Sequence, residues 1–270
     1  MAEPAAPGRF LAGRSALVTG SLAGLGHAMA GALAEAGAHV TLTGLESAAA
    51  AEPVRAGLAA RSGGAIGYVQ ADLTDRGQIA ALVEAATEAG GGRLDVLVNN
   101  AVVRHFAPLE TFPLEAWDRA LAVNLNAALV ATQLVLPGMR ARGYGRIVNM
   151  TSVYGTRATT GRVDYVTTKT ALNGLTRAIA LETAGSPVSC HALVPGSVMT
   201  PIWADRVAAM MRDEGLSFEE AERLFLDGKQ PSRSFVSPAS VSAMLLLCGP
   251  AGPDMNGAIV PIESGWLASA

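Results

Sequence analysis

Short apolar runs rich in β-branched residues alternate along this chain with longer, alanine-rich segments of helical period. The short runs predict strands at residues 15–19, 39–43, 65–70, 96–99, 145–150, 188–194 and 258–262. The longer segments predict helices at residues 25–36, 77–89, 114–139 and 165–184. Strands and helices that alternate in this way are typical of βαβ units around a buried parallel sheet. We therefore predict an α/β fold with a doubly wound, seven-stranded parallel sheet and helices on both faces.

The same pattern sets the expected domain limits. Residues 1–12 are interrupted by Pro4 and Pro7 and predict a flexible N-terminal arm, which leaves residues 13–270 as a single domain. Within that domain the sheet rhythm stops at residues 201–238, where a polar helical stretch intervenes. Insertions of this kind between a strand and the next helix often cover a site, so we expect this segment to act as a substrate lid.

Two of the expected helices carry unusually wide apolar faces. Residues 114–139 and 165–184 have more apolar surface than one contact with a sheet requires. These faces fit a subunit interface in a homotetramer or homodimer. Packing against the sheet explains them equally well.

Composition and charge limit the partners. The chain has 20 Lys and Arg residues against 23 Asp and Glu residues, a formal net charge of −3. Nucleic acid is excluded as the main partner because it requires a clustered cationic face.

No run approaches the roughly 20 uninterrupted apolar residues of a membrane-spanning helix, so we expect no membrane contact and a cytoplasmic location. Cys190 and Cys248 lie far apart and the four histidines show no ligand spacing, which predicts buried free thiols and no metal site.

A glycine-rich segment, TGSLAGLG at residues 19–26, joins the first expected strand to the first helix. Glycines let the backbone turn tightly and approach a pyrophosphate, while the free N–H groups at the helix start face its charge. Glycines at such turns also arise from packing alone. The position of this segment in the first strand and helix of an α/β chain favours a Rossmann-type dinucleotide site.

Polar residues end two further strands. Asp72 ends the third strand, where it is placed either to accept a hydrogen bond from an adenine amine or to cap the next helix. Asn99 and Ala101 lie at the end of the fourth strand. Ligands of open α/β sheets bind at these carboxyl ends.

The most specific signal is the pair Tyr165 and Lys169, preceded by Ser152 at the end of the fifth strand. Residues at i and i+4 share one helix face, so the ammonium lies near the phenol and favours its ionised form. Taken alone, such a pair is usually a solvated helix face. Together with the glycine segment and Asn124, it predicts proton transfer in a nicotinamide-dependent oxidoreductase.

At this point the chain resembles the short-chain dehydrogenase/reductase family over residues 14–266. The resemblance rests on TGSLAGLG, ADL, NNA, VNL, YVTTK and a Pro-Gly pair, which occur in the family's order. It implies that Tyr165 is the general acid/base and that Ser152 hydrogen-bonds the reacting oxygen. It also implies that Lys169 binds the nicotinamide ribose and that Asn124 holds a water that relays the proton.

The resemblance also implies which residues contact the cofactor. Besides Tyr165 and Lys169, the expected cofactor residues are Gly20, Ser21, Ala23, Gly24, Leu25, Gly26, Gly44, Leu45, Asp72, Leu73, Asn99, Ala101, Pro195, Gly196, Val198 and Thr200. No acidic side chain ends the second strand and no arginine stands there or in the glycine segment. The lack of a basic group for a 2′-phosphate favours NAD, and NADP is not excluded.

Within the family, phrases such as ALETAG and KQPS with a following FV are similar to bacterial D-3-hydroxybutyrate dehydrogenases. Where those enzymes place Gln, His and Lys around a short carboxylate, this chain has Arg104, Tyr154 and Arg162. Ser197 replaces a Trp and Arg206 replaces a Gln. Guanidinium groups bind carboxylate or phosphonate bidentately, so we expect an anionic substrate that differs from hydroxybutyrate in size or charge, with Trp266 closing the pocket.

Three functions remain open from the sequence. The first is an NAD-dependent dehydrogenase that interconverts a secondary alcohol and a ketone on a small anionic 3-hydroxy acid. The second is a reductase of a larger, specialised-metabolite ketone, which the smaller Ser197 would accommodate. The third is a non-catalytic dinucleotide sensor, although sensors commonly lose the Tyr or the Lys that this chain keeps.

Overall fold

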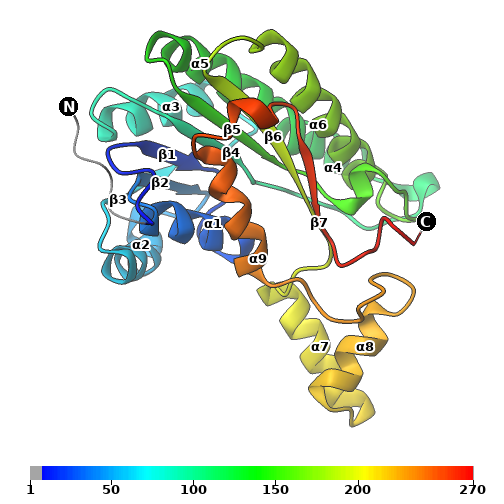
Figure 1. The fold of residues 1–270 in the computed structure, drawn as a ribbon. Helices are drawn as coiled ribbons and strands as arrows, with labels where there is room; N and C mark the ends of the chain where they lie inside the picture. Colours follow the sequence, from blue (N-terminus) through cyan, green and yellow to red (C-terminus); the bar gives the residue numbers. More distant parts are fainter. Residues whose placement is uncertain (1–7, 270) are drawn as a thin grey trace.

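A seven-stranded parallel sheet forms the centre of the molecule in the computed structural model, which describes residues 8–269 (Figure 1). The strand order is β3-β2-β1-β4-β5-β6-β7. The strands are β1 (Ser15–Val18), β2 (His39–Gly44), β3 (Ile66–Gln70), β4 (Val96–Asn99), β5 (Gly145–Met150), β6 (Val188–Pro195) and β7 (Ile259–Ile262). The predicted fold class is confirmed.

Helices cover both faces of this sheet. The helices of the body are α1 (Gly24–Glu35), α2 (Ala48–Ser62), α3 (Arg76–Ala89), α4 (Leu114–Leu121), α5 (Ala127–Ala141), α6 (Val163–Glu182) and α9 (Pro238–Ala243). Helices α1, α2 and α9 share one core with the sheet, and α3, α5 and α6 share the other. Each helix returns the chain across the sheet, so every strand can run in the same direction.

Alternation of side chains along the strands builds these two cores. Val18 and Val98 belong to the core under α1, whereas their neighbours Leu17 and Leu97 belong to the core under α3 and α5. Both faces of a central parallel strand are buried, which explains why these strands are continuous apolar runs. The strand order reverses direction between β1 and β4, and ligands of open α/β sheets bind at such a switch point.

The N-terminal expectation needs a correction. The predicted arm spans residues 1–12, of which residues 1–7 lie outside the described residues. Leu11, however, is completely buried in the core, and its backbone N–H donates to the carbonyl of Ala36. The folded body therefore begins before residue 13, because an apolar side chain at this position seals the end of α1.

Two helical regions also differ from the sequence prediction. Helix α2 was not predicted, because it buries only Ala51 and Leu58 and contains Pro53, so it shows almost no apolar period. The single helix expected at residues 114–139 is divided by a π-helical segment, Ala122–Asn126, between α4 and α5. Such segments inside helices are frequent at functional sites.

Helices α7 (Pro201–Glu214) and α8 (Phe218–Leu226) form a hairpin that projects from the body below β7 and α9 (Figure 1). A capping box between Ser217 and Glu220 starts α8. Aromatic rings hold the hairpin together: Trp203 lies 5.1 Å from Phe225 between ring centroids, and Phe225 stacks on Phe235 at 5.6 Å. The hairpin falls within the expected lid segment.

One helical run, Leu114–Ala141, is long and apolar enough to cross a membrane by length and composition. Its first turns carry Glu115, Asp118 and Arg119, and its α5 part packs on α3 and β5. A core helix of a soluble protein passes the same test of length and composition. The contacts of this run are those of a helix that covers the sheet.

Candidate active site

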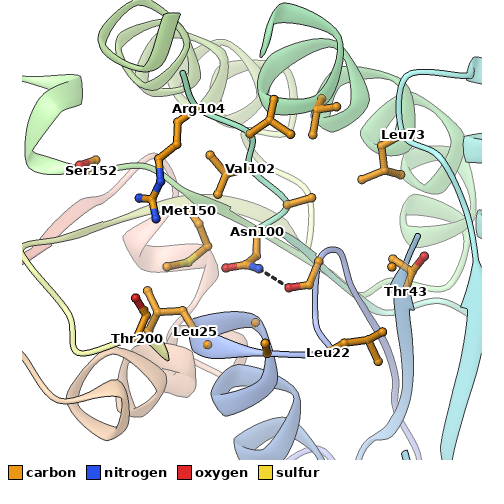
Figure 2. Close-up of a pocket in the computed structure, with 18 of the residues that line it drawn as sticks. Leu22, Leu25, Thr43, Leu73, Asn100, Val102, Arg104, Met150, Ser152 and Thr200 are labelled. Atoms are coloured by element: carbon orange, nitrogen blue, oxygen red, sulfur yellow. Dashed lines mark hydrogen bonds between the residues drawn. The ribbon is translucent and has the colours of Figure 1, made fainter. Parts of the chain in front are cut away.

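A cavity of about 540 Å³ opens at the carboxyl ends of the strands, beside the switch point between β1 and β4. Figure 2 shows residues that line this cavity, with Arg104 and Ser152 on one side of it and Leu22, Leu25 and Thr200 on the opposite side. A cavity of this size at this position accommodates a large ligand.

The glycine segment forms one wall of the cavity through close backbone approach. Gly20 and Gly24 have positive φ angles of 61° and 57°, which other L-residues rarely adopt. A Cβ atom on Gly26 would collide with the carbonyl of Gly20 and with the side chain of Asn100. Asn100 donates to that carbonyl at 2.9 Å, a hydrogen bond drawn in Figure 2, and so fixes the loop from β4.

The start of α1 faces the cavity with its backbone donors free. Its N-cap residue is Ala23, which makes no side-chain capping bond, and its first turn has no acidic residue. Most helices satisfy these donors with Ser, Thr, Asp or Asn. The bare helix start and the glycine loop therefore fit a dinucleotide pyrophosphate.

Most of the expected cofactor residues line this one cavity. Those that do are Gly20, Ala23, Gly24, Leu25, Gly26, Gly44, Leu45, Asp72, Leu73, Ala101, Tyr165, Lys169, Pro195, Gly196, Val198 and Thr200. They come from the ends of β1, β2, β3, β4 and β6 and the segments that directly follow, and from helix α6. The sheet brings them together because all its strands end at the same edge.

Ser21 and Asn99 are corrections, since neither lines the cavity. Ser21 is completely buried, and its hydroxyl accepts from the backbone N–H of Thr43. Asn99 donates its amide to Asn149 on the neighbouring strand at 2.8 Å. Both side chains tie adjacent strands together beneath the site.

Sequence reasoning missed two residues of the adenosine end, Glu46 and Arg119, which both line the cavity. The Glu46 carboxylate turns back over Gly44, where it would contact a Cβ atom at that glycine. Tyr68 fixes the loop by donating to the backbone carbonyl of Glu46 at 2.5 Å. Glu46 follows the end of β2 by two residues, so a search at the strand end alone does not find it.

Asp72 is the acidic residue that the sequence predicts in this region, and it lines the cavity. It does not cap helix α3, because Asp75 does. Its carboxylate accepts from both the backbone N–H and the hydroxyl of Thr74 at 2.9 Å, and these hydrogen bonds lower the pKa of Asp72. The other carboxylate oxygen remains available at the cavity wall.

Tyr165 and Lys169, the pair predicted to be catalytic, lie one turn apart on α6. Lys169 is buried, its ammonium lies 5.6 Å from the ring centroid of Tyr165, and it donates to the carbonyl of Met150 at 2.6 Å. Burial, with a smaller contribution from the charge of Arg104, lowers the pKa of Lys169 to about 7. Lys169 makes no salt bridge with any described residue and retains two N–H donors for ribose hydroxyls.

Ser152 starts the short turn after β5, and its hydroxyl oxygen accepts from the backbone N–H of Tyr154 at 3.2 Å. The hydroxyl proton has no acceptor among the described residues. Ser152, Tyr165 and Lys169 line the same cavity. The serine can therefore donate to an oxygen bound beside the tyrosine.

Asn124 lies in the π-helical segment and does not line this cavity. Its amide exchanges two hydrogen bonds of 2.8 Å with the backbone of Val103 and donates to Thr168 at 3.2 Å. The side chain thus fixes the strand-like segment that carries Arg104. The proton-relay water stays a prediction, since the amide is already engaged within the protein.

Four of the six expected substrate residues surround the catalytic tyrosine. Arg162 is buried, with its guanidinium carbon 4.4 Å from the Tyr165 ring centroid and 5.0 Å from that of Tyr154. Tyr154 in turn packs edge-on against Trp266 at 5.5 Å. Arg104 lines the cavity itself and lies 5.5 Å from the ring of Trp203 on α7.

The other two expected substrate residues lie farther out. Arg206 is exposed on α7, with its guanidinium 6.0 Å from the ring of Phe225. Ser197 is half-buried in the loop after β6, and its backbone N–H donates to the side chain of Gln230. The substrate role of the Ser197 side chain stays a prediction. Gln230 was not predicted; it is buried, and its amide also holds the carbonyl of Ser234 at 2.6 Å. It anchors the end of the lid segment to the loop after β6.

No group of three His, Cys, Asp or Glu side chains with metal-binding geometry occurs within residues 8–269. Cys190 and Cys248 are both buried free thiols, as the sequence predicts.

Comparisons with known proteins agree with this geometry. The sequence profile of the short chain dehydrogenase family matches residues 14–210. A D-beta-hydroxybutyrate dehydrogenase of Cupriavidus necator is 40% identical over 262 residues, which cover 96% of this chain and 100% of that relative. Another of that name from Rhizobium meliloti is 34% identical and covers 94% of this chain and 99% of its own.

Solved structures give the same fold. L-sorbose reductase from Gluconobacter frateurii, complexed with NADPH and L-sorbose, superposes with a TM-score of 0.89 at 25% identity and covers 96% of this chain and 98% of its own. Levodione reductase superposes with a TM-score of 0.84 at 29% identity and covers 96% of this chain and 100% of its own. The similarity extends over nearly the whole length of all these proteins.

Proposed function

Because this chain belongs to the short-chain dehydrogenase/reductase family of NAD(P)-dependent enzymes that act on secondary alcohols, we propose that it interconverts a small anionic 3-hydroxy acid and its ketone. The observation that carries this proposal is the position of Arg162, buried against the ring of Tyr165. A buried guanidinium beside the reacting group favours an acid over a neutral ketone. The similarity to hydroxybutyrate dehydrogenases supports the same class.

The residues of the cavity have distinct tasks in this reaction. When bound, the nicotinamide cofactor supplies or accepts the hydride. In the oxidation direction Tyr165 takes the proton of the substrate hydroxyl, and in reduction it returns a proton to the carbonyl oxygen. Ser152 donates a hydrogen bond to that oxygen with the proton that the protein leaves unused. The Lys169 ammonium stabilises the phenolate and binds the ribose.

The preferred cofactor in this proposal is NAD. Glu46 places a carboxylate over Gly44 at the cavity edge, where the adenosine ribose of a dinucleotide bound by the glycine loop would lie. A carboxylate accepts hydrogen bonds from ribose hydroxyls and repels a 2′-phosphate. The sequence favours NAD only because no basic group is present for a 2′-phosphate. The Glu46 carboxylate adds a positive reason for the same preference.

A self-associated protein is part of the proposal as well. Leu129 and Leu134 on α5 are 40% and 44% exposed, and Leu181 on α6 is 79% exposed. These are the two helices whose apolar faces exceed one sheet contact. Exposed leucines on both helices support a homodimer or homotetramer formed through α5 and α6.

A substrate panel tests the proposed function. Purified protein is mixed with NAD and 3-hydroxybutyrate, other short 3-hydroxy acids and neutral secondary alcohols, and reduced nicotinamide is followed by absorbance. We expect turnover with the acids only, and a loss of at least about 10³-fold in Tyr165→Phe, with NADH binding retained. Faster turnover of neutral alcohols, or unchanged turnover in the variant, would contradict the proposal.

A further inference from the structure

Four cationic side chains lie in or beside the active site: Arg104 lines the cavity, Arg162 lies against Tyr165, and Arg206 and Lys229 lie on the lid segment close enough to Arg162 for their charges to interact. None of them forms an ion pair within the described part of the chain. One nearby carboxylate, Asp164, is engaged otherwise, because its two oxygens accept from the backbone N–H groups of Tyr165 and His105. No carboxylate of the described residues therefore forms an ion pair with these four cations, although the charge of Asp164 still acts on Arg162.

Aromatic rings hold these cations at two places. Arg162 lies over Tyr165 and Tyr154, beside the reacting group. On the lid, Lys229 places its ammonium 4.2 Å from the ring centroid of Phe225, and Arg206 lies 6.0 Å from the same ring. Cation–π contacts of this kind position a charge but do not neutralise it.

Arg104 and Trp203 join the two places. The guanidinium of Arg104 lies 5.5 Å from the ring of Trp203, and Trp203 packs 5.1 Å from Phe225. Arg104 also lines the cavity beside Lys169, whose pKa its charge helps to lower. A continuous row of cations thus runs from the reacting tyrosine to the lid.

The cations repel one another across this row. The pKa of Lys229 is lowered by burial, then by Arg206 and Arg162, and the pKa of Arg162 is lowered by burial and, less strongly, by Arg104. Arg162 is only 9% exposed, and its Nε atom has no hydrogen-bond partner among the described residues. Burying unmatched like charges is costly, and an anionic ligand would remove that cost.

On the basis of the proposed function, we infer that the substrate carries two acidic groups, the first bound by Arg162 and Arg104 and the second by Arg206 and Lys229. A single carboxylate would satisfy the cations beside Tyr165 and leave those on the lid unmatched. The ligand class is therefore a small secondary alcohol with acidic groups on both sides of the carbinol carbon. The second acid also links two parts of the lid segment, since its two cations come from α7 and from the loop after α8.

The matched probes are 3-hydroxyglutarate and 3-hydroxybutyrate, which differ in a carboxylate in place of a hydrogen on the terminal methyl group. We expect kcat/KM for the diacid to exceed that for the monoacid by at least about tenfold, as one added charge-assisted contact of about 1.4 kcal/mol or more would give. Glutarate and butyrate, which lack the reacting hydroxyl, give the same comparison as dissociation constants for the protein–NADH complex. The comparison in the wild-type protein requires no variant.

Variants locate the second acid. Arg206→Gln and Lys229→Gln should each lower glutarate affinity at least about fivefold more than butyrate affinity. Arg212→Gln serves as the matched control, because Arg212 is an exposed cation on the same helix, α7, with no recorded contact. It should leave both affinities unchanged.

The outcomes separate the two proposals. Equal or better use of the monoacid, with NAD reduced, would overturn the two-acid inference and leave the proposed function intact. Failure of both acids to bind or react would overturn both. An equal loss for glutarate and butyrate in the Arg206 and Lys229 variants would also overturn the inference, because it would show no site for a second acid.

Discussion

The ammonium of Lys169 donates to the backbone carbonyl of Met150 at 2.6 Å from a position that solvent barely reaches. This contact holds the lysine beside Tyr165 but offers it a neutral partner only. The cavity therefore contains a cation that the protein does not neutralise. Such a group is expected where a ligand completes the environment, and it has measurable consequences for stability.

Replacing Lys169 should change how stability depends on pH. Its pKa of about 7 lies below the unfolded value of 10.5, so the unfolded chain binds more protons between these values and wild-type stability rises as pH rises from 7 to 10.5. Burial of the charged ammonium therefore destabilises the folded wild-type protein, most strongly below pH 7, and Lys169→Met removes this destabilisation. The free energy of unfolding of the variant, measured in urea without cofactor, should exceed that of the wild type by about 3 kcal/mol less at pH ~9.5 than at pH ~6.5. The same difference in free energy of unfolding at both pH values would show that burial does not lower the pKa of Lys169.

Glu46 should determine cofactor choice. Glu46→Gln removes a negative charge from the position where a 2′-phosphate would lie, so NADPH affinity should increase about tenfold while NADH affinity decreases severalfold. Dissociation constants from nicotinamide fluorescence measure both effects without turnover. Glu88→Gln is the control, because Glu88 is exposed near the end of α3, at the opposite edge of the sheet. Unchanged NADPH affinity in Glu46→Gln would remove Glu46 from the cofactor site.

Features formed by residues close together in the chain were predictable from the sequence. Tyr165 and Lys169 lie one helical turn apart, and Gly20, Gly24 and Gly26 lie in one short segment that leads into α1, so their spacing alone places them together. Strand ends were equally predictable, because a parallel sheet brings them to one edge.

Features that depend on packing between distant segments were not predictable. Ser21 and Asn99 stand in the right motifs, but neighbouring strands take up their side chains. Glu46 reaches the cavity only because Tyr68 on β3 fixes its loop. The approach of Arg104 to Trp203 on α7 joins segments that lie far apart in the chain, which no sequence period encodes.

His191 should make the protein sensitive to acid. The imidazole is buried in β6 with Nε2 2.9 Å from the Ser189 hydroxyl, and burial, aided by Arg146, lowers its pKa to about 4. Because the unfolded value is 6.5, stability from this group is full above pH 6.5 and is lost as pH falls toward 4. Between pH ~7 and pH ~5 the wild type should lose about 2 kcal/mol more than His191→Gln in denaturant unfolding. Parallel losses in both proteins would show that His191 does not titrate in this range.

Asp95 should stabilise the folded protein as the shared counter-charge of nearby arginines beside the sheet. It is completely buried, accepts from Arg93 Nε at 2.7 Å and from the backbone N–H of Ser15 at 3.0 Å, and lies 3.7 Å from Arg142. Asp95→Asn keeps the shape but leaves these guanidinium groups without their shared counter-charge, so the free energy of unfolding should fall by about 3 kcal/mol.

Equilibrium urea unfolding measures this loss, and Asp213→Asn on the surface of α7 provides the control, with a change near zero. The cavity lies at the carboxyl ends of the strands, whereas Asp95 directly precedes β4 at the opposite edge. NADH affinity below the unfolding transition should therefore stay within about twofold of wild type. A large loss of NADH affinity at unchanged stability would contradict this prediction, because it would show that Asp95, at the amino end of β4, affects the cavity at the carboxyl ends of the strands.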